Sequence, residues 1–535
     1  MKETVLERLE RLGADMAGVL AARCGDEALE LTALVDQDSH LTPLTLRDEE
    51  GRRIYERSVR FVMLLAIRRL YPGQQVRIEF SVGGGVLLRL PGRQLTEAEV
   101  ETIEAEMRRI VADDLPFEKA IWTREEAIAY FERDGQMDKA ELLRTRRFPQ
   151  IAMYGCDGMW AYFYGAMTPS TGYVPVFALS YHEAGLVLRL PTQTRLDSPA
   201  PYIDRPKHLA VFSQSAKWCE ILGVLNAPDV TRMVREKRLR NFIRVNEALH
   251  DKAIADIAEL IVSHGRRIVL VAGPSSSGKT TFTGRLAVHL QALGKKPAVI
   301  SMDNYYRNRD ELPVREDGTV DLEALDTLDV DLLQEQLMRL LAGETVNVPR
   351  FNFTTGKREE QGVPLTLLPD QPVLMEGIHG LNPALSDHLP QELIHRVFVS
   401  ALTCLNLDDH NRIRTTDVRL LRRIVRDMQF RGTPPEETLG MWDSVRAGEE
   451  TWIFPHQEQA DSVFNTALHY ELPVLKHIAY PMLAKVPKDN PWAIMARRLR
   501  KVLNYFPDID PEVLGEIPPL SLLREFIGGC TIDQE

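Results

Sequence analysis

Short runs of alternating apolar and polar residues characterise the first 190 residues. The runs at 74–82 and 85–91 predict a β-hairpin that turns through Gly83 and Gly84. Apolar positions at helical spacing predict helices over 53–72, 95–112 and 123–146. This combination of hairpins and amphipathic helices indicates an α+β region.

The pattern changes after a proline-rich segment at 192–210. A long polar helix is expected over 227–263, and the apolar strand IVLVA that follows it ends at Ala272. From there strands and helices alternate, which is typical of a parallel α/β sheet. The last residues, 491–535, have helical character. The second half is therefore predicted to be an α/β domain with a helical extension.

Composition places the chain among ordinary globular proteins. Its 535 residues are 44% hydrophobic and 27% charged, which is enough for several buried cores. The net charge of −12 argues against a general nucleic-acid binder, because neutralising phosphates requires a basic surface. Five scattered cysteines fit free thiols in a reducing compartment, and no apolar run predicts a membrane span or signal peptide. We therefore expect a cytoplasmic protein.

The segment GPSSSGKTT lies between the strand IVLVA and a predicted helix. It matches G-x-x-x-x-G-K-[ST], in which glycines let the backbone wrap a phosphate and the helix N-terminus adds a favourable dipole. Lys279 is expected to contact the β- and γ-phosphates of ATP, and Thr280 to hold Mg²⁺. The alternative is a glycine-rich turn without a chemical role. The predicted nucleotide-binding residues are Gly273, Pro274, Ser275, Ser276, Ser277, Gly278, Lys279, Thr280 and Thr281.

Two acidic residues follow later apolar strands. Asp303 ends PAVISMD and Glu376 ends QPVLMEG, and ligands of open α/β sheets bind at the carboxyl ends of strands. Asp303 is placed to take a proton from an acceptor hydroxyl, and Glu376 to hold Mg²⁺ or its water. The alternatives are a cap of the next turn for Asp303 and an ordinary surface acid for Glu376.

The segment 417–431 predicts an amphipathic helix. Leu420, Leu421, Ile424, Val425 and Met428 form its apolar face. Its other face carries four arginines, which repel one another unless an anion meets them. We interpret this helix as a lid that closes over the triphosphate and excludes water, and the alternative is a solvated basic face. The four arginines are Arg419, Arg422, Arg423 and Arg426.

These segments together resemble the uridine kinase and phosphoribulokinase family of P-loop kinases. The resemblance covers about 265–480 and is carried by GPSSSGKTT, SMDNYY, PRFNF, LMEGI and RLLRRIVRDMQFRG. It implies transfer of the γ-phosphate of ATP to a sugar hydroxyl. It also implies a set of catalytic residues, with the aspartate as base and the arginines holding ribose or phosphates. That set is Asp303, Lys279, Arg419, Arg422 and Arg426.

The same resemblance implies an acceptor site between Asp303 and Glu376. Glu323 stands where these kinases typically have a ribose-binding aspartate, and Phe351 stands for a tyrosine. The histidine that reads uracil falls on Gly356, so uracil selectivity is in doubt. Phe351 and Phe353 are expected either to stack a base or to fill a core. The predicted substrate residues are Tyr306, Glu323, Phe351, Phe353 and Arg358.

The N-terminal half resembles the front of threonyl-tRNA synthetase. The similar segments include YERSVRFVMLLAIRRLYPG and LTEAEVETIEAEMRRIVADDLPF. Two editing-site histidines of that enzyme are replaced by Arg57 and Phe61, and its cysteine and histidine fall on Cys156 and Trp160. We therefore expect no hydrolysis of aminoacyl esters.

The overall prediction is an α/β P-loop kinase preceded by α+β synthetase-like domains. It uses ATP and Mg²⁺, and its acceptor is a small hydroxyl compound, with a nucleoside as the leading candidate. An ATP-switched RNA-binding protein and a kinase of a sugar phosphate or pantothenate-like acceptor are the alternatives; a homo-oligomer is allowed. The expected divisions are a β-grasp domain at 1–52, an editing-like domain at 53–191, a linker and helix at 192–263, the kinase at 264–485 and an extension at 486–535.

Overall fold

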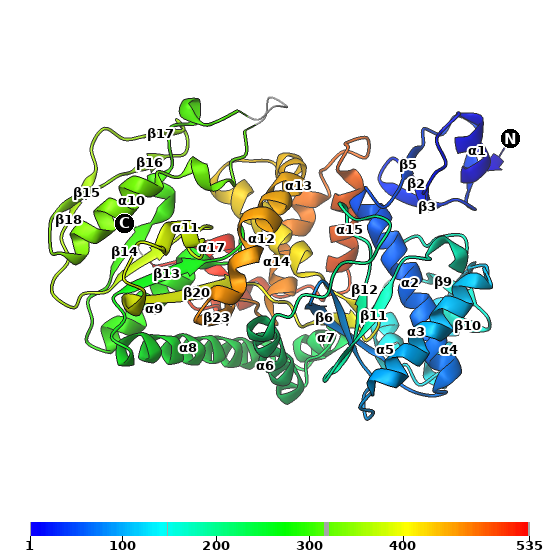
Figure 1. Cartoon of the computed structure of the whole chain (residues 1–535). Helices are drawn as coiled ribbons and strands as arrows, with labels where there is room; N and C mark the ends of the chain where they lie inside the picture. Colours follow the sequence, from blue (N-terminus) through cyan, green and yellow to red (C-terminus); the bar gives the residue numbers. More distant parts are fainter. Residues whose placement is uncertain (1, 147, 315–319, 533–535) are drawn as a thin grey trace.

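The computed structural model of the protein describes residues 2–146, 148–314 and 320–532. The blue and cyan N-terminal elements lie on one side of the molecule, and the green to red elements of the second half lie on the other (Figure 1). Among the described residues, no helix is both long and apolar enough to cross a bilayer.

The first 48 residues form small sheets around one short helix. A capping box in which Thr4 and Glu7 exchange hydrogen bonds starts that helix. Val5 and Leu9 of the helix are buried with Leu31 and Val35. The elements are β1 (Lys2–Thr4), α1 (Val5–Arg11), β2 (Ala21–Cys24), β3 (Glu27–Glu30), β4 (Leu34–Asp36) and β5 (Thr42–Leu44).

The next region packs helices against a four-stranded antiparallel sheet of order β11-β12-β7-β6 and a three-stranded sheet of order β10-β9-β8. Its central helix is α2, whose residues from Tyr55 to Ile67 are almost all buried. The elements are α2 (Glu49–Leu70), β6 (Arg77–Val82), β7 (Gly85–Arg89), α3 (Glu97–Ala112), β8 (Glu118–Thr123), α4 (Arg124–Arg133), α5 (Met137–Arg144), β9 (Gln150–Cys156), β10 (Met159–Ala161), β11 (Ala178–His182) and β12 (Gly185–Arg189).

The predicted hairpin is present as β6 and β7, and Gly83 and Gly84 adopt the positive φ angles that its turn requires. Two predicted helices are each divided. The helix expected over 123–146 breaks at Gly135, which has φ +77°. The helix expected over 227–263 breaks near Lys237, which has φ +56°. The linking helices are α6 (Pro206–Leu222), α7 (Ala227–Arg235) and α8 (Leu239–Ser263).

The second half contains a five-stranded parallel sheet of order β14-β19-β13-β20-β23. This confirms the predicted α/β fold. β13 lies at its centre, and every residue of that strand is buried. The strands and their first helices are β13 (Ile268–Ala272), α9 (Lys279–Ala292), β14 (Ala298–Ser301), α10 (Val330–Leu341), β19 (Val373–Glu376), α11 (Pro383–Ser386), β20 (Ile394–Ser400) and β23 (Ser462–Asn465).

This domain also contains short two-stranded sheets and a group of helices. The small strands are β15 (Val346–Val348), β16 (Phe351–Asn352), β17 (Lys357–Arg358), β18 (Val363–Leu365), β21 (Asn406–Asp408) and β22 (Asn411–Arg412). The helices are α12 (Thr415–Phe430), α13 (Pro435–Trp452), α14 (Glu471–Leu483), α15 (Ala493–Leu503), α16 (Pro511–Gly515) and α17 (Arg524–Ile527).

The predicted lid helix, α12, is part of the core. Leu420, Leu421, Ile424 and Val425 are fully buried among side chains of α13, α14 and α15. Met428, which was expected on the apolar face, is 42% exposed. The helix is therefore packed into the body of the protein, and the structure corrects its interpretation as a free lid.

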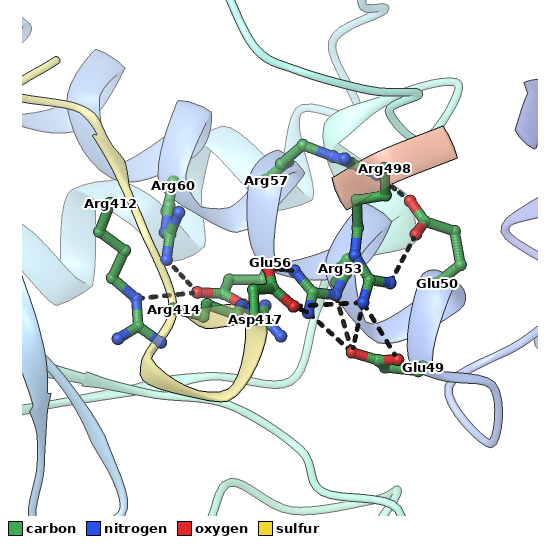
Figure 2. Close-up of polar contacts among 10 residues, drawn as sticks. All are labelled: Glu49, Glu50, Arg53, Glu56, Arg57, Arg60, Arg412, Arg414, Asp417 and Arg498. Carbon is green, nitrogen blue, oxygen red and sulfur yellow. Dashed lines mark hydrogen bonds and ion pairs between the residues drawn. The ribbon is translucent and has the colours of Figure 1, made fainter. Parts of the chain in front are cut away.

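Charged side chains join the N-terminal region to the first turn of α12 (Figure 2). Arg53 of α2 donates to both carboxylate oxygens of Asp417, at 3.1 and 2.7 Å, and Arg498 of α15 donates to Asp417 at 3.2 Å. Arg60 and Arg414 both pair with Glu56. Asp417 and Arg53 are buried, so these pairs fix the two regions to each other through contacts shielded from water.

Candidate functional site

The phosphate loop connects β13 to α9 in a strained turn. Ser276 and Gly278 have φ angles of +57° and +89°. A Cβ atom at Gly273 would lie 2.0 Å from the carbonyl oxygen of Val399, so only glycine allows the loop to pass β20 this closely. The hydroxyls of Ser276 and Ser277 are buried and have no hydrogen-bond partner among the described residues.

Distant segments hold both ends of this loop. The amide of Ser275 donates to Glu449 of α13 at 3.0 Å, and its carbonyl accepts from Arg419 at 2.9 Å. Arg423 donates to the hydroxyl of Ser275 at 2.7 Å. At the other end, the amide and hydroxyl of Thr281 donate to Glu525 at 3.3 and 2.8 Å.

A cleft of about 290 Å³ opens at this loop. Most of the residues predicted for nucleotide, acceptor and catalysis line it together. They are Ser275, Ser276, Ser277, Gly278, Lys279, Thr280, Asp303, Tyr306, Glu323, Phe351, Phe353, Glu376 and Arg426. The remaining predicted residues do not line the cleft. They are Gly273, Pro274, Thr281, Arg358, Arg419 and Arg422.

Asp303 and Glu376 lie at the ends of neighbouring strands, with Lys279 close to both. Burial raises the pKa of Asp303, while Lys279, Arg431 and a hydrogen bond from Tyr306 act to lower it. Burial and the charge of Asp303 raise the pKa of Glu376 to about 7. The hydroxyl of Ser301 donates to Glu376 at 3.0 Å. The pair therefore presents acidic oxygens whose ionisation depends on nearby cations.

Glu323 approaches the cleft from the segment that precedes α10. Burial and the charge of Glu449 raise its pKa to about 7, and Arg423 opposes that shift. A Cβ atom at Gly448 would lie 2.4 Å from the Cβ of Glu323, so the absence of a side chain there lets α13 approach closely. Glu323 can thus accept a hydrogen bond from an acceptor hydroxyl when it is ionised.

The arginines of α12 divide into two groups. Arg419 and Arg422 are 1% and 0% exposed and pair with Glu449 and Glu471. Arg422 also donates to the carbonyl of Thr466 at 2.9 Å. They therefore support the loop from behind, in contrast to the direct phosphate or ribose contact expected from the sequence.

Arg423 and Arg426 belong to the second group and line the cleft, together with Arg431. Arg426 also donates to Asp427 at 2.8 Å. The acids that pair with Arg419 and Arg422 come from α13 and α14. The periodicity of α12 alone therefore could not show which arginines are paired in the core and which line the cleft.

The aromatic residues form a compact patch at the far end of the cleft. The rings of Phe351 and Phe353 are 5.2 Å apart and nearly perpendicular, and Tyr306 lies 5.7 Å from Phe351. Phe353 is 51% exposed, so this patch is accessible and does not merely fill a core. Arg358 lies outside the cleft and donates to the carbonyls of Tyr305 and Tyr306 at 2.7 and 2.8 Å. It positions the patch from behind.

Gly356 has φ +68°, and a Cβ atom there would lie 2.5 Å from Cδ of Arg309. The side chain of Arg309 thus occupies the space beside Gly356, and Arg309 lines the cleft. Arg307, Arg309, Arg431 and Glu525 are cleft residues that the sequence prediction omitted. Arg431 extends the series of arginines in α12, so the sequence could have indicated it. Glu525 lies far from the phosphate loop in the sequence, and the loop motif could not predict it.

The donor set suits a magnesium nucleotide. Thr280, Asp303 and Glu376 supply hard oxygen atoms, which Mg²⁺ prefers. No group of three or more His, Cys, Asp or Glu side chains converges on one metal position within the described residues, so few protein ligands are available. Such a site fits Mg²⁺, which usually keeps several waters and binds through substrate phosphates. The unpartnered Ser276 and Ser277 hydroxyls fit phosphate oxygens.

The editing-like positions of the N-terminal region are engaged in packing. Arg57 donates to Glu50 at 2.9 Å, and Phe61 contacts the rings of Phe117 and Phe163. Burial raises the pKa of the Cys156 thiol to about 11, so the thiol is protonated at neutral pH. Arg57, Phe61 and Cys156 therefore have structural surroundings in this chain.

Comparisons with known proteins find two groups of relatives. A model of the phosphoribulokinase / uridine kinase family matches residues 268–471. Uridine kinase of Deinococcus deserti is 32% identical over 206 residues, which are 38% of this chain and 89% of that enzyme.

The N-terminal region is similar to threonine–tRNA ligases. That of Desulforamulus reducens is 31% identical over 177 residues, or 32% of this chain and 27% of the ligase, so the chain spans about a quarter of the ligase's length. Among solved structures, a putative fructose transport system kinase from Silicibacter is 20% identical with a TM-score of 0.31, over 39% of this chain and 98% of that one.

Proposed function

Since the chain belongs to the phosphoribulokinase and uridine kinase family, we propose that it transfers the γ-phosphate of ATP to a hydroxyl group of a nucleoside or a related small molecule. It is a P-loop kinase with an N-terminal region like that of threonine–tRNA ligases. One observation carries the proposal: Asp303 shares a single cleft with the phosphate loop and with the aromatic patch.

The loop residues bind the triphosphate. In the described part of the chain, the amides of Ser276, Gly278, Lys279 and Thr280 have no protein acceptor, so they are free to donate to phosphate oxygens. Lys279 would contact the β- and γ-phosphates, and Thr280 and Glu376 would hold Mg²⁺. The metal ion, when bound, offsets the negative charge of the phosphates during transfer.

Asp303 activates the acceptor. It takes the proton from the acceptor hydroxyl while that oxygen bonds to the γ-phosphorus and the bond to the β-phosphate oxygen breaks, which leaves ADP. Arg423, Arg426 and Arg431 lie along the same wall and stabilise the charge on the transferring group. Tyr306 orients Asp303 through its hydroxyl.

The acceptor end favours a compound with a flat face. Phe351, Phe353 and Tyr306 offer exposed aromatic surface for stacking a base, and Glu323 can hold a sugar hydroxyl. The side chain of Arg309 occupies the space that a side chain at position 356 would need, and this is the position on which the family's uracil-reading histidine falls. These features support a nucleoside acceptor without uracil selectivity, and a sugar phosphate or pantothenate-like acceptor is the alternative.

The test replaces Asp303 with Asn and follows ADP formation across a panel of nucleosides, sugar phosphates and pantothenate. We expect wild-type turnover with at least one nucleoside. The variant should lose about 10²- to 10⁴-fold in kcat because its base is removed, while ATP binding changes little. Lys279→Ala is the control that loses ATP binding. Equal transfer by the Asp303 variant would remove its role as base.

The N-terminal similarity to threonine–tRNA ligases supports a second function, in which ATP gates contact with RNA. A gel-shift assay with bulk tRNA, with and without ATP, tests it. An ATP-dependent shift together with no turnover on any acceptor would favour this function. The absence of a shift at low and moderate salt would exclude it.

A further inference from the structure

The C-terminal segment 517–532 crosses the back of the phosphate loop, although it lies well beyond the family match at 268–471. Leu522 is completely buried with Val269, Val271 and Phe282, which are residues of β13 and α9. A Cβ atom at Gly284 of α9 would lie 2.2 Å from Cγ2 of Ile532. The segment is therefore packed directly against the strand and helix that carry the loop.

Polar contacts fix the same segment in place. Ser521 donates to Glu247 of α8 at 2.6 Å, and Tyr470 donates to the same carboxylate at 2.5 Å. Phe526 is buried beneath the guanidinium of Arg422, 5.1 Å from its ring centre. Arg524 donates to the carbonyls of Leu514 and Ile517. These anchors hold Glu525, which lies between Arg524 and Phe526, at a defined position.

Glu525 reaches the first turn of α9. One of its carboxylate oxygens accepts from both the amide and the hydroxyl of Thr281, and the residue lines the nucleotide cleft. Glu449 accepts from the amide of Ser275 at the opposite end of the loop. Two carboxylates thus occupy the outer amides of the loop, and the amides of Ser276, Gly278, Lys279 and Thr280 between them are left for phosphate, whereas that of Ser277 donates to the carbonyl of Pro274.

We propose that Glu525 is a positioning residue of the nucleotide site, and that the C-terminal segment supports the Thr281 end of a loop whose Ser275 end is held by residues within the family match. The inference rests on the proposed function. Glu525 fixes the Thr281 amide and hydroxyl, and through them the orientation of the turn that carries Lys279 and Thr280. ATP affinity therefore depends on a hydrogen-bond acceptor at position 525.

The experiment measures the Kd for MgATP by titration calorimetry in the full chain. Glu525→Ala should weaken binding by about tenfold, the effect of losing one to two hydrogen bonds. Glu525→Gln keeps an acceptor oxygen and should stay within about threefold of wild type. Glu516 immediately precedes this segment and pairs with exposed Arg244. Glu516→Ala removes one negative charge there, and as the matched control it should leave the Kd unchanged.

A double-mutant cycle separates positioning from a general loss of folding. Thr281→Val removes only the hydroxyl contact, so it should weaken MgATP binding by less than Glu525→Ala does. The two changes together should cost no more than Glu525→Ala alone, because that variant already removes the contact with the hydroxyl. The KM of the acceptor should not move. Additive effects, an unchanged Kd, or tighter ATP binding by Glu525→Ala would overturn the proposal, the last because the carboxylate would then compete with phosphate. Wild-type protein that fails to bind MgATP would instead refute the proposed function.

Discussion

At the scale of single residues, one lysine, Lys279, acts electrostatically on three carboxyl groups of the cleft. Lys279 lowers the pKa values of Asp303, Glu323 and Glu376, but burial raises all three by more. A bound metal ion or triphosphate changes this balance, because cations favour the ionised carboxylate. The protonation of these three carboxyl groups therefore differs between the cleft without ligand and the cleft that holds a metal ion or triphosphate.

In the folded state without nucleotide, the proton on Glu376 should contribute stability that is lost as pH rises from about 5 to 8. The pKa of Glu376 is raised from 4.5 to about 7, so the folded protein binds this proton more tightly than the unfolded chain does. The stabilisation is complete below pH 4.5 and is lost as pH rises through 7. Urea unfolding at a series of pH values measures it.

Glu376→Gln should make this dependence less steep, because glutamine does not titrate, while Glu323, whose pKa is also raised to about 7, still contributes to it. Glu335→Gln, a change on the exposed face of α10, is the control and should retain the wild-type slope. A slope that is equal in all three proteins would show that Glu376 does not carry the shift.

At the scale of elements, α12 connects three parts of the molecule. Its first turn binds the N-terminal region through Asp417, its middle holds the phosphate loop through Arg419, and its last turns line the cleft with Arg423 and Arg426. The arginine side chains thus have different tasks although they lie on one stripe of the helix.

The substitutions Arg422→Met and Arg426→Met should therefore affect different properties of the protein: the first its stability and the second its kcat. Removing Arg422 leaves Glu471 buried without its partner, and the free energy of unfolding should fall by about 3–5 kcal/mol. Removing Arg426 takes a cation from the cleft wall, so kcat should fall while stability changes by less than about 1 kcal/mol. Urea unfolding and steady-state kinetics on the same preparations check both outcomes.

A loss of kcat without destabilisation in the Arg422 variant would restore the catalytic role that the sequence suggested for it. Rescue of stability by the double change Arg422→Met with Glu471→Leu would confirm that the pair acts within the core, since apolar replacement of a buried pair is often tolerated.

The sequence predicted the elements best where the pattern was local. The phosphate loop, the parallel sheet and the hairpin at Gly83 follow from motifs and periodicity. The break at Lys237 does not, because a lysine with positive φ carries no warning in its residue type. The sequence also did not predict that Glu449 and Glu525 support the loop, because only the tertiary fold brings them to Ser275 and Thr281.

At the scale of the whole molecule, the kinase domain and the synthetase-like region share a buried charged junction. Asp417 accepts from Arg53 and Arg498, which come from α2 and α15 (Figure 2). Both guanidiniums depend on this carboxylate, because the other acids nearby, Glu49 and Glu50, are shared among the same arginines.

Asp417→Asn should weaken the link between the two regions. It removes one negative charge from between two arginines, and breaking a buried pair costs about 3–5 kcal/mol. We expect calorimetry to show a lower melting temperature and a single transition that broadens or divides. Asp256→Asn, in an exposed pair with Lys252, is the control. A melting curve identical to wild type would show that the junction adds nothing to cohesion.

The contact between Thr281 and Glu525 also has a consequence for protein synthesis. The chain is made from its N-terminus, so the phosphate loop emerges from the ribosome well before residue 525 does. Leu522 and Phe526 can take their places against β13 and α12 only after the segment beyond the family match has been made. A nascent chain therefore first carries the full loop motif without its last support, and it gains full affinity for ATP only after residue 525 has folded against Thr281.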